Sequence, residues 1–526
     1  MKKLTDYTAY ADAQQHWSPE KLWELFDGDE SALNIAHECI DRHAADADRV
    51  AITVVHAKGR DEVLSFRDIS QASSRFAHYL IARGVAQGDR VAIMLEPSKA
   101  FYAALFGVMK TGAIAVPMFT LFGPDALRLR IEDCRPKLLL TNPEKAELAN
   151  GLPQVNTVVV DDAFLDGLDD FPDVFTPSTR AGDLAIFQYT SGTTRELPDA
   201  IRHTHKAVVT LMVAALYGTG LRPGDKFFCP SSPAWGHGLW HGTLAPLALG
   251  LSIGAFSGKF NASRLLQALS EHRFTNMSAA ATHYRMMRNS PEIQQYSYHL
   301  NKLSFTGEPI DSSTETFIQA LFNTPICSMY GTTEIGVILV SYPGAPDFAV
   351  KHGSLGKPIP GGIVEIQDPQ GQPCPPNVIG EMKVKRRNEW VATKDLGRID
   401  EDGYFYHAGR ADDVIISAGW TMSAVEIEDT LLKHPDIREA AVIGVPDALR
   451  GQVVKAFVIS TRPCSDAFTT EIQDFVRTQL SQHEYPRHIA YPSELPKTPA
   501  GKIHRKKLRE LEAASTTQPE QENITQ

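Results

Sequence analysis

The feature that most constrains the fold is an alternation of helix-like and strand-like runs between about Leu64 and Pro117. In chain order the pattern predicts a helix ending at Leu80 to Arg83, a strand at Val91–Met94, a helix at Ser98–Lys110 and a strand at Ala113–Val116. Strands that alternate with helices in this way form a parallel sheet covered by helices. The same alternation returns through residues 205 to 330, which predicts an α/β fold.

The pattern changes after Lys351, where glycines and prolines separate short strand-like segments. A second unit begins near Gly409, because Ser423 and Glu426 are spaced as a capping box at the start of a helix that runs to about Lys433. A strand from Glu439 to Val445 follows it. We therefore expect an N-terminal domain at residues 1–411, a C-terminal domain at 412–512 and a polar, frayed tail at 513–526.

Composition limits the partners that the protein can have. The chain has 526 residues and a formal net charge of -11, which argues against a general nucleic-acid or acidic-membrane surface. Its most apolar stretch, Leu244–Phe256, is interrupted by proline and glycine and is too short to cross a bilayer. The N-terminus has no apolar segment of a secretory signal, and six scattered cysteines suit reduced thiols. We expect a soluble, cytoplasmic protein.

A phosphate-binding loop is predicted at Thr190–Thr194, in the sequence Tyr-Thr-Ser-Gly-Thr-Thr. Small residues allow the backbone to approach a phosphate closely, and the N–H groups and hydroxyls of Thr190, Ser191, Gly192, Thr193 and Thr194 can donate to its oxygens. A polar turn that follows a strand fits the same residues equally well. The motif alone does not separate the two interpretations.

Further motifs follow in a fixed order along the chain. They are Gly307-Glu308-Pro309, Tyr330-Gly331-Thr332-Thr333-Glu334, Asp395, Gly409 to Asp413, Gly419 with Glu426 and Glu428, and Pro496 to Lys502. This series resembles the adenylate-forming superfamily of acyl-CoA synthetases, adenylation domains and luciferases, from about residue 30 to 512. The resemblance implies a large N-terminal domain with two βαβ-type sheet subdomains and a β-rich subdomain, and a small mobile α+β C-terminal domain beyond a hinge at Asp412.

The resemblance implies an AMP-forming acid–thiol ligase. A carboxylate is a poor electrophile, so ATP first converts it to an acyl-adenylate with loss of pyrophosphate, and a thiol then displaces AMP. Coenzyme A is the expected acceptor, because the motifs are most similar to acyl-CoA synthetases. A stand-alone enzyme that loads a carrier protein is one alternative, and a non-catalytic nucleotide-binding relative is another.

Residue roles in nucleotide binding follow from the same resemblance. Thr190–Thr194 and Tyr330–Thr332 contact ATP, Gly307, Glu308 and Pro309 flank the adenine, and Asp395 accepts hydrogen bonds from the ribose with Arg410 nearby. Glu334 is expected to hold Mg²⁺, a hard cation suited to carboxylate oxygen, with Thr333 beside it at the phosphates. No tightly bound organic cofactor is expected.

Lys502 is the expected cation of the adenylation step, where it would stabilise the charge that develops between the carboxylate and ATP. A solvated basic face is the alternative, because Lys497, Arg505, Lys506, Lys507 and Arg509 lie close by in the sequence. Rotation about Asp412 would then withdraw Lys502 and bring Gly419 and Trp420 to the coenzyme A channel.

The chain departs from the family pattern at two places. T-S-G-T-T is usually followed by G-x-P-K-G, whereas here Arg195 to Ala200 lacks the lysine and both glycines, and one residue is inserted. Three cations can compensate for the missing lysine, namely Arg195, Arg202 and Lys206; the alternative is a loop that closes over ATP and contributes little charge. The second departure is Thr393-Lys394-Asp395, where the family usually has T-G-D.

The acyl pocket is expected along Pro233–His241 and beside the motif glycines. Its residues would be Trp235, Gly236, His237, Gly238, Thr306 and Gly331. Acetate-specific relatives carry a bulky aromatic residue at the position of Gly331, so the acid should be larger than acetate: short branched or hydroxy, medium-chain or aryl. His237 can recognise a polar group on the acid or can be a packing residue. The protein is expected to be a monomer or homodimer.

Overall fold

The computed structural model describes residues 2–150, 152, 155–189, 200–332, 335–410, 415–417, 420–447, 450–480, 485–497 and 503–516. The chain divides into two units. The first comprises Met1–Gly307, Ile318–Val350 and Pro358–Gly361, and the second comprises Glu308–Phe317, Lys351–Lys357 and Gly362–Gln526.

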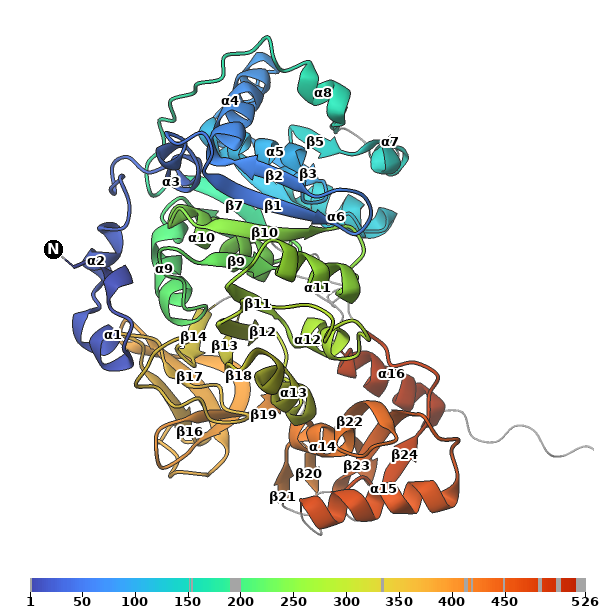
Figure 1. Cartoon of the computed structure of the whole chain (residues 1–526). Helices are drawn as coiled ribbons and strands as arrows, with labels where there is room; N and C mark the ends of the chain where they lie inside the picture. Colours follow the sequence, from blue (N-terminus) through green and yellow to red (C-terminus); the bar gives the residue numbers. More distant parts are fainter. Residues whose placement is uncertain are drawn as a thin grey trace, which may run out of the picture. The chain divides into compact units, whose positions relative to one another are not determined.

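A nine-stranded sheet runs through the first unit (Figure 1). Its order is β15 (Lys357–Pro358), β14 (Gly336–Val340), β13 (Ile326–Thr332), β12 (Lys302–Thr306), β11 (Asn276–Ala280), β9 (Lys226–Cys229), β10 (Ser252–Ser257), β1 (Val50–His56) and β2 (Glu62–Ser65). The six strands from β13 to β1 are parallel, and β14 and β2 are antiparallel to their neighbours.

The second sheet of this unit has six strands. Its order is β6 (Asn156–Val159), β5 (Leu138–Thr141), β3 (Arg90–Met94), β4 (Ile114–Pro117), β7 (Leu184–Gln188) and β8 (Ile201–Thr204). All pairs are parallel except the last, in which β8 forms an antiparallel edge with β7. The predicted βαβ alternation is therefore confirmed in both sheets.

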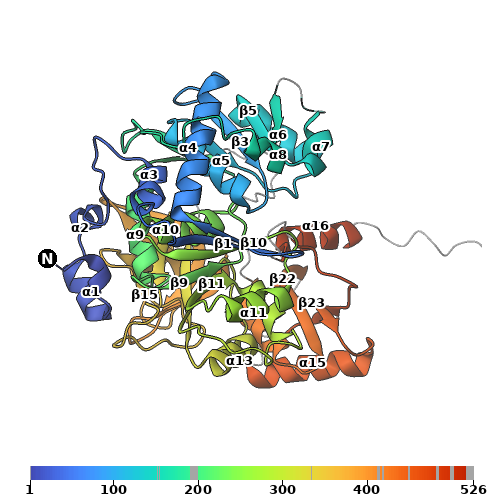
Figure 2. The ribbon, with the colours of Figure 1, turned by 45° about the horizontal axis from the view of Figure 1, so that its top comes forward.

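Helices α4 (Phe66–Ala82) and α5 (Lys99–Lys110) pack side by side (Figure 2). Ser98 caps α5 by accepting a hydrogen bond from the backbone N–H of Phe101 over 3.2 Å, and every residue from Phe101 to Lys110 is buried. Buried Lys110 is neutralised by Asp41, whose carboxylate lies 2.7 Å from its Nζ.

The other helices of the first unit are shorter. They are η1 (Leu4–Asp6), α1 (Tyr10–His16), α2 (Pro19–Trp23), α3 (Ile35–Cys39), η2 (Asp41–His43), α6 (Pro124–Cys134), η3 (Pro143–Lys145), α7 (Ala146–Asn150), α8 (Asp162–Asp166), α9 (Ala207–Tyr217), α10 (Ala245–Ala248), α11 (Ala262–Glu271), α12 (Ala281–Arg288) and a π-helix, η4 (His237–Leu244). Helix α13 (Ser312–Phe322) has residues in both units.

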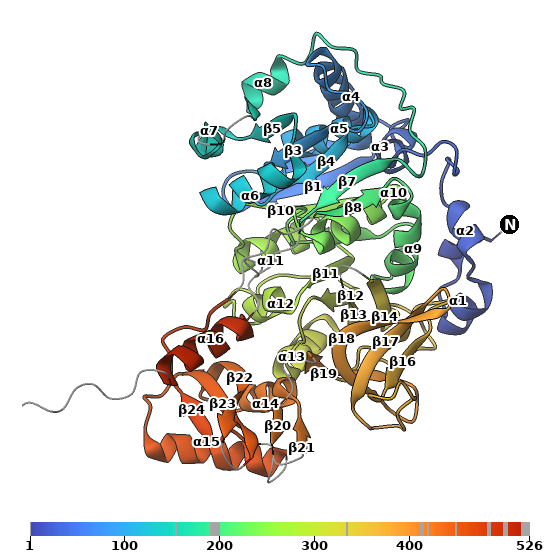
Figure 3. The same ribbon diagram turned by 180° about the vertical axis from the view of Figure 1, so that it is seen from behind.

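The second unit contains two antiparallel layers (Figure 3). The first is β16 (Val364–Gln367), β17 (Gly380–Arg386), β18 (Glu389–Ile399) and β19 (Phe405–Arg410). The second has the order β21 (Trp420–Met422), β20 (Ile415–Ser417), β23 (Gly451–Ser460) and β22 (Ile437–Asp447), with β24 (His488–Ala490) parallel to β23.

Three further helices complete the second unit: α14 (Ala424–Leu432), α15 (Asp466–Gln479) and α16 (Arg505–Thr516). Helix α14 begins where the capping signal predicts, because Ser423 Oγ accepts a hydrogen bond from the N–H of Glu426 over 3.3 Å. The helix then packs beside β22. Among the described residues, no helix is long and apolar enough to span a bilayer, and all six cysteines are free thiols.

Candidate active site

The carboxyl edge of the nine-stranded sheet gathers several predicted site residues. Strands β12 and β13 are parallel with Phe305 opposite Ser328, so β12 ends at Thr306 near the point where β13 reaches the Tyr330 motif. Gly307 has a φ of +91°, which ends β12 in a conformation that favours glycine. Open α/β sheets bind ligands at this edge. The fold thus brings Thr306 and Gly307 beside the Tyr330 motif.

Gly331 has a steric reason to be glycine. It lies in the β13–β14 hairpin opposite Val337, and a Cβ at this position would lie 2.1 Å from the carbonyl oxygen of Gly336 and 2.6 Å from the Cα of Val337. Both contacts are with backbone, so the hairpin itself requires the small residue. Thr332 is half-buried and its Oγ1 accepts a hydrogen bond from the N–H of Ile335 over 3.3 Å, whereas Thr333 and Glu334 lie outside the described residues.

The predicted acyl segment follows β9 and enters the π-helix η4. His237 is buried, and its two ring nitrogens hydrogen-bond with Ser231 Oγ at 3.0 Å and Ser278 Oγ at 2.8 Å. Both polar atoms of the ring thus have protein partners, which favours the packing interpretation of this histidine. A Cβ on Gly238 would lie 2.2 to 2.3 Å from the carbonyl oxygens of Ser232 and Ser231, so this glycine also has a backbone contact to avoid.

Strands β7 and β8 flank the predicted phosphate loop. Gln188 is opposite Ile201 and Phe187 is opposite Arg202, so the chain leaves the sheet at Gln188 and re-enters it at Ile201. Thr190–Thr194 and Arg195 lie outside the described residues, which end at 189 and resume at 200.

The hairpin separates two of the three candidate cations for this loop. Arg202 is exposed one residue beyond the loop, and its guanidinium lies 5.2 Å from the centroid of the Phe187 ring. Lys206 follows the opposite end of β8, where its Nζ pairs with Glu30. Arg202 is therefore the better placed of the two to meet a phosphate.

The backbones of Asp395 and Arg410 are opposite each other in the antiparallel β18–β19 pair. Asp395 is buried, its N–H donates to Thr393 Oγ1 over 3.1 Å, and Oδ1 lies 3.8 Å from Nε2 of His407. The structure describes Arg410 by its backbone alone.

Lys394 adopts the backbone conformation that the usual glycine of T-G-D would favour. Its φ is +63°, at a bulge where β18 has extra residues relative to β17. Thr393 Oγ1 holds the bulge by donating to the carbonyl of Met382 over 2.8 Å. The turn that carries Asp395 is thus formed despite the substitution, at a cost of about 1–2 kcal/mol for a left-handed non-glycine residue.

The remaining predicted residues are only partly described. Glu308 and Pro309 follow Gly307 as a half-buried and an exposed residue, Trp235 and Gly236 are half-buried, and Trp420 is described by its backbone in β21. The residues outside the described parts are Asp412, Gly419 and Lys502.

The basic cluster near Lys502 is not uniformly solvated. Lys497 Nζ lies 2.8 Å from a carboxylate oxygen of Glu439, and Arg505 forms a bidentate ion pair with Glu428. Lys506 is exposed on α16. Two of the cations therefore have structural partners in the second unit, which weakens the interpretation of the whole cluster as one solvated face.

Two side chains that sequence reasoning missed lie beside the predicted site. Trp240 Nε1–H donates to Gln188 Oε1 over 2.7 Å, and both residues are buried. This bond joins the last residue of β7 to the π-helix that follows β9. A polar residue at the end of an otherwise apolar strand was the available signal for Gln188, but nothing in the sequence identifies its partner.

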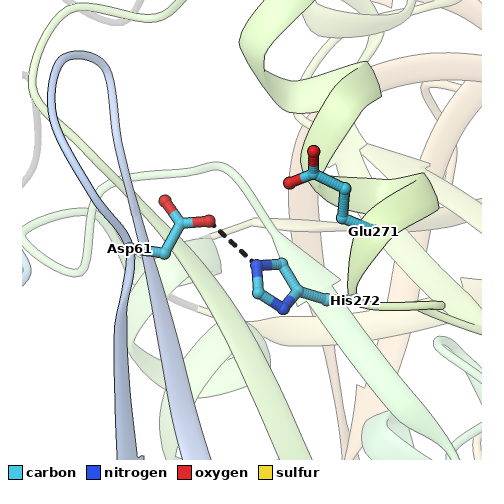
Figure 4. A group of neighbouring side chains, drawn as sticks. All are labelled: Asp61, Glu271 and His272. Atoms are coloured by element: carbon cyan, nitrogen blue, oxygen red, sulfur yellow. Dashed lines mark hydrogen bonds and ion pairs between the residues drawn. The ribbon is translucent and has the colours of Figure 1, made fainter.

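Two groups in the described part of the chain have metal-ligand chemistry. One is Asp61, Glu271 and His272, which Figure 4 shows between the β1–β2 turn and the end of α11. His272 Nε2 lies 2.8 Å from Asp61 Oδ2, and Arg264 pairs with the other oxygen of the carboxylate. The second group is His434, Asp436 and Glu471, where Arg462 pairs with both carboxylates. An arginine already pairs with at least one carboxylate in each group, which favours structural ion pairs.

Comparison with known proteins identifies the family. Residues 40–392 match the model of the AMP-binding enzyme family, and residues 426–502 match that of the AMP-binding enzyme C-terminal domain. Acetyl-coenzyme A synthetase of Bacillus subtilis (strain 168) is 30% identical over 522 residues, with 91% of each chain covered.

Two solved structures are similar along almost the whole chain. The acyl-CoA synthetase of Brucella canis is 29% identical with a TM-score of 0.75, covering 97% of this chain and 100% of its own. The anthranilate CoA ligase AuaEII, solved with anthranoyl-AMP, is 28% identical with a TM-score of 0.83, covering 92% and 98%.

The chain belongs to the AMP-binding enzyme family. The predicted membership of the adenylate-forming superfamily, in the acyl-CoA synthetase branch, is confirmed. The predicted α/β fold and the class of enzyme, an AMP-forming acid–thiol ligase, are confirmed with it. The roles of individual residues stay predictions.

Proposed function

We propose that the protein activates a carboxylic acid larger than acetate as its acyl-adenylate, with release of pyrophosphate, and then transfers the acyl group to coenzyme A with release of AMP. The observation that carries the proposal is the convergence at one sheet edge. Thr306 and Tyr330 lie toward the carboxyl ends of the neighbouring parallel strands β12 and β13, in a chain that matches both AMP-binding family models. ATP, the acid and coenzyme A are substrates in this proposal.

Residues of the first half-reaction would hold ATP and the acid in line. The backbone and hydroxyls of Thr190–Thr194 would bind phosphate, and Asp395 would accept hydrogen bonds from the ribose. The position of Asp395 supports this role, because Asp395 is buried, lies opposite Arg410 in the β18–β19 pair and follows the bulge at Lys394. Glu334 would hold Mg²⁺, since a carboxylate oxygen is a suitable ligand for this hard cation.

Lys502 would supply the positive charge of adenylation. Charge develops on the acid oxygen and on the phosphate in the transition state, and a preorganised ammonium stabilises it there. The proposed domains are 1–411 and 412–512, with the flexible tail 513–526 beyond them and a hinge at Asp412. Rotation about this hinge would exchange Lys502 for Gly419 and Trp420 between the two half-reactions.

The acid remains the least constrained part of the proposal. The relatives above are named for acetyl and anthranilate activation, which supports only the general class of carboxylic acids. Both ring nitrogens of His237 hydrogen-bond with serines, which argues against recognition of a polar group of the acid by this residue. Short branched or hydroxy, medium-chain and aryl acids therefore all belong in the test panel.

The decisive experiment is acid-dependent pyrophosphate exchange followed by mass spectrometry of the thioester formed with coenzyme A. Purified, folded protein should exchange pyrophosphate only when a suitable acid is present. A carrier protein offered in place of coenzyme A should accept no acyl group. Absence of exchange across a broad acid panel would instead support a nucleotide-binding relative.

Lys502→Ala separates the two half-reactions. It should lower the rate of acyl-adenylate formation by at least about 100-fold, while thioester formation from supplied acyl-adenylate stays within a few-fold of wild type. Lys506→Ala is the matched control, because Lys506 is an exposed lysine on α16 four residues further along. Equal losses in both half-reactions would contradict the assigned role.

A further inference from the structure

One residue contacts both arms of the phosphate-loop hairpin. Trp240 donates a hydrogen bond from Nε1 to Gln188 Oε1 at the end of β7, and its ring lies 4.7 Å from the ring centroid of His203 on β8. Gln188 precedes the loop and His203 follows it. Both β7 and β8 belong to the six-stranded sheet, whereas Trp240 belongs to the π-helix after β9 of the nine-stranded sheet.

Both contacts are uncharged, and the side chains of Gln188 and Trp240 are buried while His203 is half-buried. Gln188 is 4% exposed and Trp240 is 7% exposed. Burial lowers the pKa of His203 to about 4, so its ring is neutral near pH 7. No hydrogen bond to Nε2 of His203 is found among the described residues, and its contact with Trp240 is a tilted ring packing at 59°. Such contacts depend on position and are insensitive to salt.

The position of the Gln188 amide is sterically constrained from a second side. A Cβ on Gly236 would lie 2.5 Å from Gln188 Nε2, so the amide occupies the space of a missing side chain. Gly236 directly precedes the π-helix. The acyl segment thus contacts Gln188 through both Gly236 and Trp240, and a shift of this segment moves the end of β7.

The π-helix is a local structure that can transmit such a shift. Its eight residues, His237–Leu244, are wound more widely than in an α-helix, and π-helical turns are frequent at functional sites. Trp235 and His237 are neighbours of the same segment, with ring centroids 5.4 Å apart. Trp235, which is proposed to meet the acid, and Trp240, which contacts both arms of the loop, therefore belong to one continuous segment of the chain.

We propose that Trp240 is a positioning residue that couples the acyl segment to the ATP phosphate site, so that the bound acid changes the affinity for ATP. This inference rests on the proposed function for the identity of the acid. The coupling would act through the π-helix, which contacts Gln188 and His203. These two residues lie on the strands that flank the loop, β7 and β8. Reciprocity then requires ATP to change the affinity for the acid by the same factor.

The test is Trp240→Phe, which keeps an aromatic ring and removes the N–H donor. Isothermal titration should show ATP binding about tenfold more weakly, because Gln188 loses its partner and the loop arm loses a fixed position. The ratio of ATP affinities with and without a substrate acid should fall toward one. Trp390→Phe, which alters a tryptophan on β18 of the second unit, should leave both values within twofold of wild type.

Gly236→Ala gives a second route to the same contact with Trp240 intact. Its methyl group would displace the Gln188 amide, so weaker ATP binding and weaker coupling are expected again. ATP affinity and coupling within twofold of wild type in a folded Trp240→Phe protein would overturn the inference. Lack of acid-dependent exchange in the wild type would refute the proposed function alone, since ATP titration without acid still reports on the positioning of the loop.

Discussion

Gly331→Ala separates two explanations of one glycine. The resemblance of the sequence motifs to acyl-CoA synthetases suggests that Gly331 widens the acyl pocket. The structure adds a steric requirement, since a Cβ would lie 2.1 Å from the carbonyl oxygen of Gly336. Real Cβ atoms do not approach an oxygen so closely, so the hairpin must move by more than about 1 Å to admit even a methyl group.

The expected cost follows from the atoms that have to move. Overpacking against side chains costs about 1–3 kcal/mol, and this contact is with backbone held by the β13–β14 pairing, so we expect the upper end, about 3 kcal/mol. Denaturant unfolding followed by fluorescence measures this as a lower midpoint for the first unit. Pyrophosphate exchange should fall for every acid in the panel, because the displaced hairpin carries Thr332.

A selective result would refute this reasoning. If Gly331→Ala were as stable as wild type and lost only the larger acids, the glycine would act through pocket width alone. Gly182→Ala is a matched control for the general cost of replacing a glycine, because Gly182, like Gly331, does not have a left-handed φ and has no atom within 4 Å of a built Cβ. Its change in stability would reflect the replacement of a glycine without a collision.

Three further results are expected. Lys394→Gly should raise the free energy of unfolding by about 0.5–1 kcal/mol in denaturant titrations. The backbone strain of a left-handed lysine, which glycine removes, is larger than the entropy that glycine adds to the unfolded chain. A lower stability would contradict a strained turn. Arg202→Ala should raise the KM for ATP several-fold while Lys206→Ala leaves it unchanged, and the reverse order would exclude Arg202 as the compensating cation. Acid should destabilise the first unit, because burial lowers the pKa of His203, His205 and His241 to about 4 and the unfolded chain therefore binds more protons below pH 6.5. Each histidine should lower the free energy of unfolding by about 2 kcal/mol at pH 5 relative to pH 7.5. A urea midpoint at pH 5 equal to that at pH 7.5 would disprove the effect.

Local elements were predictable because their signals are local. The helix predicted at Ser98–Lys110 is α5 at Lys99–Lys110, with Ser98 as its cap, and the capping signal at Ser423 begins α14. Each depends on hydrogen bonds between residues three or four positions apart. The strand expected at Val91–Met94 is part of β3, and its signal is the short apolar run itself, although its hydrogen bonds are made to β4 and β5.

Contacts between distant segments were not predictable from one sequence. His237 could be a ligand for the acid or a packing residue, and the decision depends on Ser278, which lies 41 positions away on β11. Gln188 and Trp240 are 52 positions apart. Gln188 ends β7 of the six-stranded sheet, and Trp240 lies in the π-helix that follows β9 of the nine-stranded sheet. Strand order decides such pairs, and strand order is set by the packing of the whole unit.

The altered phosphate loop illustrates why a departure in sequence need not disturb the fold. Relative to the family pattern the loop has one inserted residue, yet β7 and β8 pair with Gln188 opposite Ile201. A shift of β8 by one residue would turn exposed Arg202 to the face of half-buried Ile201 and His203, so burial opposes a change of register whatever the loop sequence. Lys206 with Glu30 and Gln188 with Trp240 hold the two ends of the hairpin. Selection can therefore change the charge of the loop while its attachment to the sheet stays the same, and the missing lysine bears on phosphate chemistry alone.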